Sequence, residues 1–278
     1  MAAAPGAEIV LKDEPWTRVV RRPLCGLDVV HKTYLVPPWT RWRTFLLTSR
    51  AGREYRNLSR IHASGVPCVR PLGFAEERRL GVVRRSALLT EFAPGTRSWK
   101  QELLDRPSGD RRHARARRVL AATFGALLRR LHQAGFLGAR ISPRNVLVRW
   151  QDPDRAEACA MLLCDLPAAS GFSASILDRP TAGIDLFDAA FSPGRRAQLT
   201  AAERFRLVLA YAAGDRNRAR QLWRWLARRS KRGNELRKAL RTTLDSYLGL
   251  LAQCLRRGRL HLPPTRVPEL GCAGDLLP

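Results

Sequence analysis

The sequence predicts an α+β protein of two lobes, a small and mostly β lobe with one helix, followed by a larger and mostly helical lobe. Three observations predict this arrangement. Apolar and polar residues alternate in short runs near the start of the chain, as they do in strands with one buried face. A Pro94-Gly95 pair then marks a hinge. Beyond it, apolar residues recur at the spacing of amphipathic helices.

The small lobe is expected to cover residues 1–93. Its strands and helix are predicted at Thr17–Val20, Leu27–Tyr34, Ser49–Ala63 (the helix), Pro71–Phe74, a hairpin with Val82-Val83, and Ala87–Phe92. Between the second strand and the helix, a Pro37-Pro38 pair breaks the chain and residues 39–47 form an aromatic and basic connection. The order of elements is therefore two strands, one helix and three strands.

The larger lobe is expected to cover residues 94–262, followed by a flexible tail at 263–278. Helices are predicted at 116–133, at 200–211 after a capping box of Thr200 and Glu203, at 215–226 and at 235–254. Two short strands interrupt the helical pattern, one at Asn145–Val148 and one that runs from Leu162 to the carboxylate of Asp165.

Composition limits the classes of function. The formal net charge is +26, with five lysines among 50 basic residues, so the surface suits an anionic sugar or lipid, an anionic membrane or nucleic acid. A basic surface that is merely solvated is an equal alternative. The six cysteines are scattered without a CxxC pair, and no apolar run is long enough to span a membrane. We therefore expect a cytoplasmic protein, with peripheral contact at the inner membrane as an option.

Several segments in order resemble the protein-kinase-like fold and, within it, the bacterial lipopolysaccharide kinase (Kdo/WaaP) family. The segments are VVHKTY, REYRNLSRIHASGVPCVRPLGF, LLTEFAPG, LRRLHQAGF, PRNVLV, LLCDLP, IDLFDAAF and LTAAERFRLVLAY. Enzymes of this family phosphorylate sugars of the lipopolysaccharide inner core. The resemblance implies ATP and Mg²⁺ as cofactors, bound weakly here for the reasons given below.

The resemblance also implies roles for individual residues. Lys32 would contact the ATP phosphates, Glu54 would hold Lys32, the backbone at Glu91 and Phe92 would hold adenine, and Asn145 and Asp165 would ligate Mg²⁺. Each residue also has an ordinary structural interpretation, for example a surface lysine on a strand. Asp185 resembles the helix carboxylate that braces the catalytic loop, although it could equally be a simple acid at a helix start.

Three positions depart from the family's pattern. The place of the catalytic Asp holds Arg140, in Gly138-Ala139-Arg140, so both the usual His and the base are missing. Pro167 follows Asp165-Leu166 where a Gly is usual, and no GxGxxG joins the first two strands. Arg140 could pair with Asp165 and compete with Mg²⁺, or it could contact the γ-phosphate; we favour the first.

These observations lead to three hypotheses. The first is a lipopolysaccharide-kinase-like protein of envelope biogenesis with impaired catalysis, a pseudokinase. The second is an active kinase that phosphorylates an inner-core sugar. The third is a nucleic-acid-binding protein that uses its arginine-rich surface, which the sequence disfavours because it shows no helix-turn-helix, zinc or aromatic-basic ribonucleoprotein signature. The sequence does not determine the oligomeric state.

Overall fold

The computed structural model describes residues 8–45, 47–138, 141–152, 155–166, 169–172, 174–177, 182–191 and 198–229. All of them lie in one compact unit, Met1–Ser230. The predictions for Arg140, Pro167, the helix at 235–254 and the tail at 263–278 fall outside the described residues.

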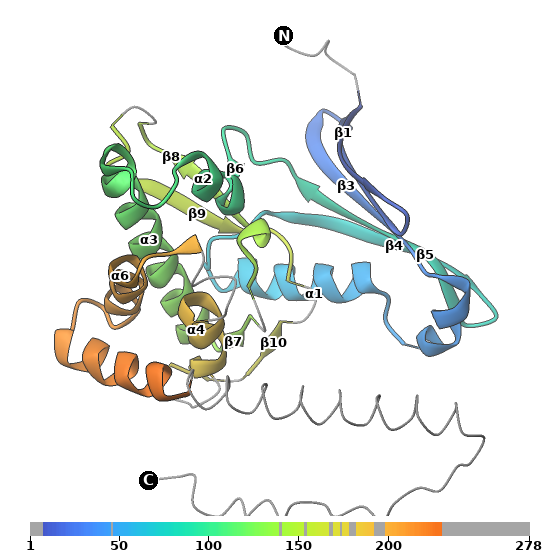
Figure 1. The fold of residues 1–278 in the computed structure, drawn as a ribbon. Coiled ribbons are helices and arrows are strands. Elements are labelled where there is room, and N and C mark those ends of the chain that lie inside the picture. Colours follow the sequence, from blue (N-terminus) through green and yellow to red (C-terminus); the bar gives the residue numbers. More distant parts are fainter. Residues whose placement is uncertain are drawn as a thin grey trace, which may run out of the picture. The chain divides into compact units, whose positions relative to one another are not determined.

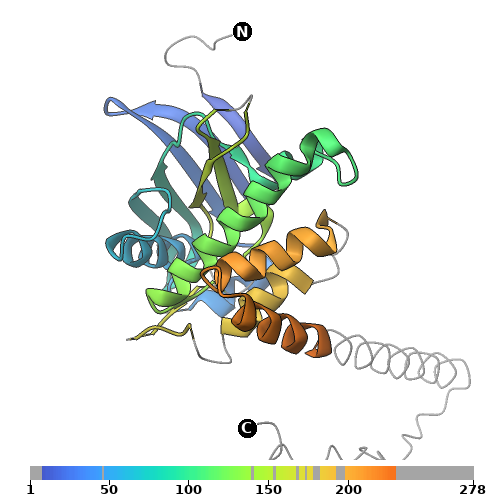
Figure 2. The ribbon, with the colours of Figure 1, turned by 90° about the vertical axis from the view of Figure 1, so that its left-hand side faces the viewer.

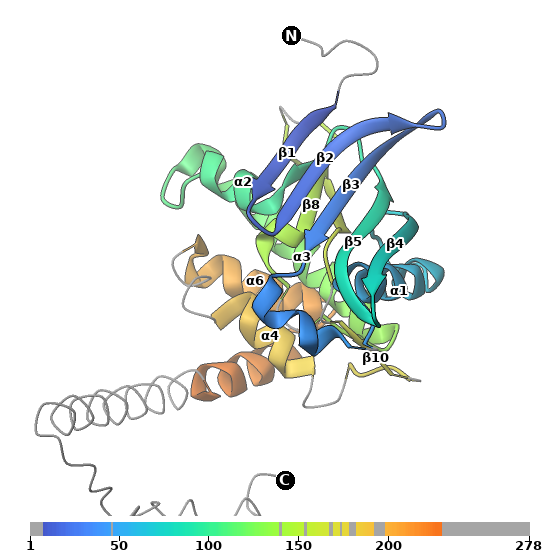
Figure 3. The same ribbon diagram turned by 90° about the vertical axis from the view of Figure 1, so that its right-hand side faces the viewer.

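A five-stranded antiparallel sheet forms the N-terminal part. Its strands are β1 (Ile9–Glu14), β2 (Thr17–Leu24), β3 (Leu27–Leu35), β4 (Pro71–Arg79) and β5 (Val82–Glu91), in the spatial order β1-β2-β3-β5-β4. Figure 3 shows this order across the sheet, with helix α1 (Arg50–Ala63) behind the β5 and β4 side. A 3-10 helix, η1 (Pro38–Thr44), connects β3 to α1. The predicted α+β class is confirmed.

The strand order differs from the prediction, since three strands precede the helix and two follow it. The first strand, β1, was missed because five of its six residues are exposed, so that it shows no apolar alternation. The two segments predicted around Val82 and Ala87 form one continuous strand, β5, because it pairs with β3 on one side and with β4 on the other.

Helix α1 begins where the sequence places it. The hydroxyl of Ser49 accepts a hydrogen bond from the Gly52 amide at 3.0 Å, which satisfies one of the free amides at the helix start. A Cβ atom added at Gly52 would lie 2.9 Å from Thr48 Cγ2 and 3.0 Å from the Phe74 ring. Glycine therefore lets α1 approach β4 closely, which brings Glu54 of the same helix under the sheet.

The C-terminal part is mainly helical, as predicted. Its elements are β6 (Arg97–Ser98), α2 (Trp99–Asp105), η2 (Arg111–His113), α3 (Ala114–Gln133), β7 (Phe136–Leu137), η3 (Pro143–Asn145), β8 (Val146–Trp150), β9 (Cys159–Leu163), β10 (Ser170–Gly171), α4 (Ala182–Phe191) and α6 (Ala201–Tyr211). Residues 216–229 are also helical. Figure 1 shows β8 and β9 between the sheet and the helices. The two residues predicted to bind metal flank this hairpin: Asn145 ends η3, just before β8, and Asp165 follows β9.

Helix α3 forms the centre of the helical part, with α6 packed along it (Figure 2). The two helices approach closely at Gly125, where an added Cβ atom would lie only 2.2 Å from the carbonyl oxygen of Leu207. Phe124 of α3 is fully buried and packs on Trp99 of α2, with ring centroids 4.3 Å apart. Within the described part of the chain, no helix combines the length and apolar character that crossing a membrane requires.

Candidate functional site

A buried ion pair joins the sheet to α1. Nζ of Lys32, on β3, lies 2.7 Å from Oε1 of Glu54, and the two side chains are 12% and 0% exposed. The hydroxyl of Tyr34 donates to the other carboxylate oxygen of Glu54 at 2.7 Å. Because Lys32 and Tyr34 are two residues apart on one strand, they share the face that α1 covers. Glu54 is thus held from two positions of β3.

The electrostatics of this pair depend on three neighbouring groups. Burial lowers the pKa of Lys32, but the carboxylates of Glu54 and Asp165 outweigh it, so that the pKa is raised and the ammonium form is favoured. Burial raises the pKa of Glu54, and Asp165 raises it further, while Lys32 opposes the rise. Lys32 is therefore a positive charge that interacts with two carboxylates in this part of the molecule.

The β8–β9 hairpin places Asn145 and Asp165 at the same end. Val146 pairs with Leu163 in register, and the amide of Cys164 donates to the carbonyl of Asn145 at 3.0 Å. Nζ of Lys32 donates to the carbonyl of Cys164 at 2.8 Å. The ammonium group of Lys32 therefore contacts the residue immediately before Asp165. The structure thus places Lys32, Glu54, Asn145 and Asp165 close together.

Oxygen atoms suited to a hard cation remain available at this end of the hairpin. Oδ1 of Asp165 is buried and makes no hydrogen bond within the described residues. Asn145 is half-buried and directly precedes β8, and its carbonyl accepts from the Cys164 amide. Mg²⁺ is commonly held by one or two protein oxygens together with phosphates and water. Asn145 and Asp165 fit this requirement, although no cluster of three His, Cys, Asp or Glu residues suited to a metal occurs among the described residues.

Two residues of α1 contact the same segment and were not predicted from the sequence. Nη2 of Arg50 lies 4.0 Å from Oδ2 of Asp165, and the Asn57 amide donates to the carbonyl of Leu166 at 2.9 Å. Arg50 and Asn57 stand one turn before and one turn after Glu54, so they share its side of the helix. That spacing is the signal that could have identified them. Arg50 brings a second cation to the edge of the site.

A buried network supports the loop that precedes Asn145. Oδ2 of Asp185 accepts from the Gly138 amide at 2.5 Å and lies 3.2 Å from Nε2 of His132. Nδ1 of His132 lies 2.8 Å from the hydroxyl of Tyr211. Asp185 therefore braces the loop, as its position in the sequence suggested. The imidazole beside it comes from α3 and was missed, because a histidine within an apolar helix face resembles an ordinary core residue. Arg140 itself is outside the described residues.

Glu91 and Phe92 lie at the end of β5, next to the predicted hinge at Pro94-Gly95. Their amides donate to the carbonyls of Arg70 and Asp28, each at 2.9 Å. The guanidinium of Arg21 stacks over the Phe92 ring at 3.8 Å. Since both amides are already bonded, an adenine placed here would meet carbonyl acceptors rather than these two donors. Their role in holding adenine stays a prediction.

The turn between β2 and β3 is too short to wrap around phosphates. It consists of Cys25 and Gly26 between the paired residues Leu24 and Leu27, and both turn residues have positive φ, 50° and 78°. This is the geometry of a tight two-residue hairpin. It provides few free amides, which agrees with the missing glycine-rich motif.

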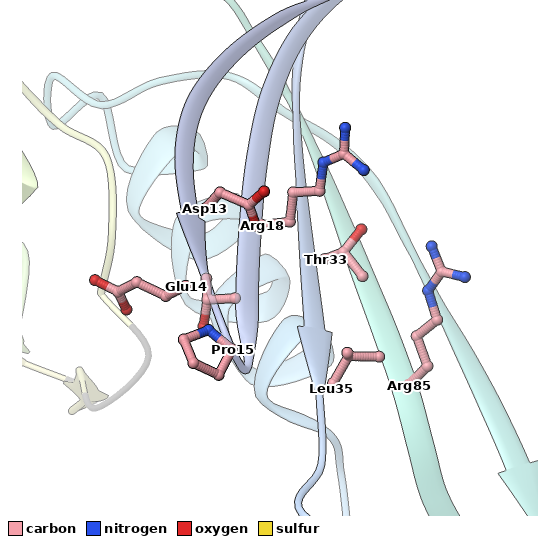
Figure 4. A pocket seen from close by; sticks show the side chains of 8 residues that line it. Asp13, Glu14, Pro15, Arg18, Thr33, Leu35 and Arg85 are labelled. Atoms are coloured by element: carbon pink, nitrogen blue, oxygen red, sulfur yellow. The ribbon is translucent and has the colours of Figure 1, made fainter.

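A hollow of about 530 Å³ lies on the other face of the sheet (Figure 4). Thr33 and Leu35 line it, and they alternate along β3 with Lys32 and Tyr34. Side chains of alternate residues in a strand point to opposite faces. Arg18, Arg85 and Asp13 surround the rest of the hollow. The hollow is therefore separate from the Lys32–Glu54 pair.

Comparison with known proteins agrees with this arrangement. The model of the lipopolysaccharide kinase (Kdo/WaaP) family matches residues 39–170, a range that includes Glu54, Asn145 and Asp165 but not Lys32. A solved structure, "WaaP in complex with acyl carrier protein", is similar with a TM-score of 0.54 and 18% sequence identity, over 80% of this chain and 87% of that chain. No curated protein matches the sequence. The predicted resemblance and the kinase-like fold are confirmed.

Proposed function

Because residues 39–170 match the lipopolysaccharide kinase (Kdo/WaaP) family, we propose that this chain is a kinase-like protein of the bacterial envelope that binds nucleotide weakly and has impaired phosphoryl transfer. One observation carries the proposal. Lys32 bridges Glu54 and the carbonyl preceding Asp165, and Asp165 keeps one oxygen without a hydrogen-bond partner among the described residues. This arrangement supports phosphate and Mg²⁺ binding at one place.

The roles of the residues follow from their chemistry. Lys32 would bind phosphate oxygens, and Glu54 would keep its ammonium group in place from the buried side. Asn145 and Asp165 would hold Mg²⁺, and the backbone near Glu91 would orient the base. When bound, Mg²⁺-ATP supplies the phosphoryl group and the charge that neutralises it.

Impairment is proposed because the position of the base holds a guanidinium. A positioned general base contributes ~10²- to 10⁴-fold to a rate, and Arg140 cannot accept a proton. Arg140 would also bring a fixed positive charge towards Asp165, whose oxygens would hold the cation. Arg50, 4.0 Å from Asp165, adds to that charge. Both arginines would therefore oppose Mg²⁺ binding.

The competing proposal is an active kinase for a sugar of the lipopolysaccharide inner core. In that case Arg140 would contact the transferred phosphate and neutralise it. Phosphoryl transfer depends more on positioning and charge neutralisation than on a base, so the loss of Asp slows this chemistry without forbidding it. Contact with the inner membrane would suit either activity, since the acceptor of the related enzymes is a lipid-linked sugar.

Thermal unfolding of the full chain tests nucleotide binding. ATP with Mg²⁺ should raise the melting temperature, by the equivalent of about 2.7 kcal/mol when the ligand is at 100 times its Kd, and chelation of Mg²⁺ should reverse the effect. Phosphate transfer to a lipopolysaccharide core acceptor would select the active alternative. Absence of any response to ATP, together with salt-dependent binding to DNA or RNA, would reject both kinase proposals.

A charge reversal tests the proposed impairment. Arg140→Asp should strengthen Mg²⁺-ATP binding or raise turnover. The gain in turnover should lie within the ~10²- to 10⁴-fold that a general base contributes to a rate. Arg144→Asp is the matched control, because Arg144 is an exposed residue of the same loop and the charge change is identical. If Arg140→Asp binds and reacts no better than the parent, or no better than Arg144→Asp, the account of the impairment is wrong.

A further inference from the structure

The 3-10 helix η1 exposes large aromatic side chains. None of its residues is buried, and Trp39 and Trp42 are 67% and 69% exposed. Phe45, which follows the helix, is 54% exposed. A 3-10 helix has three residues per turn, so residues three apart lie on the same side. Trp39 and Trp42 therefore form one aromatic edge, with Phe45 next in the series. Neighbouring exposed aromatic side chains outside a core are typical of an interaction site.

The segment is held firmly against the end of the sheet. Trp39 packs edge-on against Trp16, with ring centroids 5.3 Å apart and an interplanar angle of 89°. The hydroxyl of Thr44 accepts from the Val83 amide at 3.0 Å. Figure 3 shows η1 at the end of the sheet where β3 stops. The exposed indoles therefore project from a fixed support.

A second apolar group lies beside this helix. Arg78 donates to the carbonyl of Leu47 at 2.7 Å and to that of Gly81 at 3.0 Å, which joins the segment after η1 to the β4–β5 turn. Leu47 is 58% exposed, and Leu80, in that turn, is 88% exposed. Exposed apolar residues therefore lie both after η1 and in the β4–β5 turn, two segments that Arg78 connects.

The charged residues of η1 are all basic, while Glu76 of the neighbouring strand β4 pairs with Arg78 at 2.7 Å. Arg41 and Arg43 stand on either side of Trp42, Nε of Arg41 donates to the carbonyl of Val36 at 3.0 Å, and no acidic residue occurs between positions 36 and 49. The guanidinium of Arg43 lies 5.4 Å from the centre of the Trp42 ring. Arg79 stands next to Leu80 in the neighbouring turn. The aromatic side chains and the guanidinium groups of η1 therefore lie close together on the same short helix.

We propose that Trp39, Trp42, Phe45, Leu47 and Leu80, with Arg41 and Arg43, form a docking surface for an anionic lipid bilayer. Tryptophan favours the boundary between lipid headgroups and acyl chains, because its ring is apolar and its N–H is polar. Arginine beside it pairs with lipid phosphates and is attracted by the surface potential. Guanidinium groups next to exposed indoles match this chemistry.

Vesicle binding by the full chain tests the proposal. The parent should bind vesicles of phosphatidylcholine with phosphatidylglycerol and leave vesicles of phosphatidylcholine alone largely unbound. Trp39→Ser/Trp42→Ser should abolish binding, and Arg41→Gln/Arg43→Gln should lower the partition coefficient by roughly 30-fold, from the attraction of two basic residues. Leu104→Ser and Arg111→Gln/Arg112→Gln are controls with similar exposure or charge elsewhere, and they should bind like the parent.

The outcomes separate this inference from the proposed function, on which it does not depend. Vesicle binding is measured without nucleotide, and the response of the melting temperature to Mg²⁺-ATP should be the same in Trp39→Ser/Trp42→Ser and in the parent. The inference is overturned if the double tryptophan variant binds anionic vesicles as well as the parent does. It is also overturned if the parent binds none, or if the parent is a dimer that this variant dissociates, since the surface would then join two copies of the chain.

Discussion

Lys32 forms an ion pair with Glu54 at 2.7 Å and, with the same ammonium group, donates to the carbonyl of Cys164 at 2.8 Å. The residues come from the third strand, the first helix and the end of the β8–β9 hairpin. One cation therefore ties together the three elements that carry the candidate site. Its removal should affect the folding of the protein as well as any ligand binding.

Lys32→Met and Glu54→Gln should each lower the free energy of unfolding, by about 3–5 kcal/mol for a buried pair that loses one partner. Lys32→Met/Glu54→Leu should cost less than the sum of the single changes, because no buried charge is left unpaired. Urea unfolding at pH 7 measures these values. Additive losses would show that the two side chains do not depend on each other.

Asp165→Asn should abolish the part of the ATP response that requires Mg²⁺, since an amide is a poorer ligand than a carboxylate. The unliganded variant should be nearly as stable as the unliganded parent, because Oδ1 of Asp165 has no hydrogen bond to lose among the described residues. Thermal unfolding with ATP, with and without Mg²⁺, measures both effects. Asp13→Asn, in the hollow on the opposite face of the sheet, is the matched control. An unchanged Mg²⁺ response in Asp165→Asn would remove Asp165 from the proposed metal site.

Gly138→Ala should destabilise the protein by about 1–3 kcal/mol, because the added Cβ would lie 2.5 Å from Cδ1 of Ile141. Ile141→Ala in the same chain should restore part of the loss by making room. Denaturant unfolding of the two single variants and the double variant measures the coupling. The histidine that the resemblance to kinases implies at position 138 would meet the same obstacle. A tolerated Gly138→Ala, without the second change, would show that the loop can move away.

Glu203 should stabilise the fold in a pH-dependent way. Burial raises its pKa, but the two hydrogen bonds from Arg117 and the one from the Thr200 amide outweigh burial, so the pKa is lowered from 4.5. A lowered pKa means that the ionised form stabilises the folded state. The contribution is complete above pH 4.5 and is lost as the pH falls through the lower folded-state pKa.

Glu203→Gln should therefore cost about 3–5 kcal/mol at pH 7, with Arg117 left buried, and less as the pH falls below 4.5. Glu157→Gln is the control, because its ion pair with Arg115 is exposed and should contribute only about 0–1 kcal/mol. Unfolding free energies of the parent and both variants across this pH range measure the difference. A loss for Glu203→Gln that does not change with pH would contradict the assignment.

Local patterns in the sequence determined the elements that carry the site. The strand with Lys32, the helix with Glu54 and the capping box of Thr200 and Glu203 were predicted correctly, because alternation, helical spacing and capping involve residues close together in the chain. Strand β1 lacked such a pattern, since one strand pairs with it and most of its side chains are exposed. The sequence also did not show that β5 is one continuous strand, because its continuity depends on pairing with β3 on one side and with β4 on the other.

The sequence by itself thus determined the class of fold, the resemblance to lipopolysaccharide kinases and the residues expected at the site. Only the tertiary structure decided that Arg50 and Asn57 reach the segment around Asp165, and that His132 lies beside Asp185. These partners are separated by 53 residues or more along the chain. Their meeting depends on how α1, α3 and the hairpin pack, because no local pattern specifies a contact between distant residues.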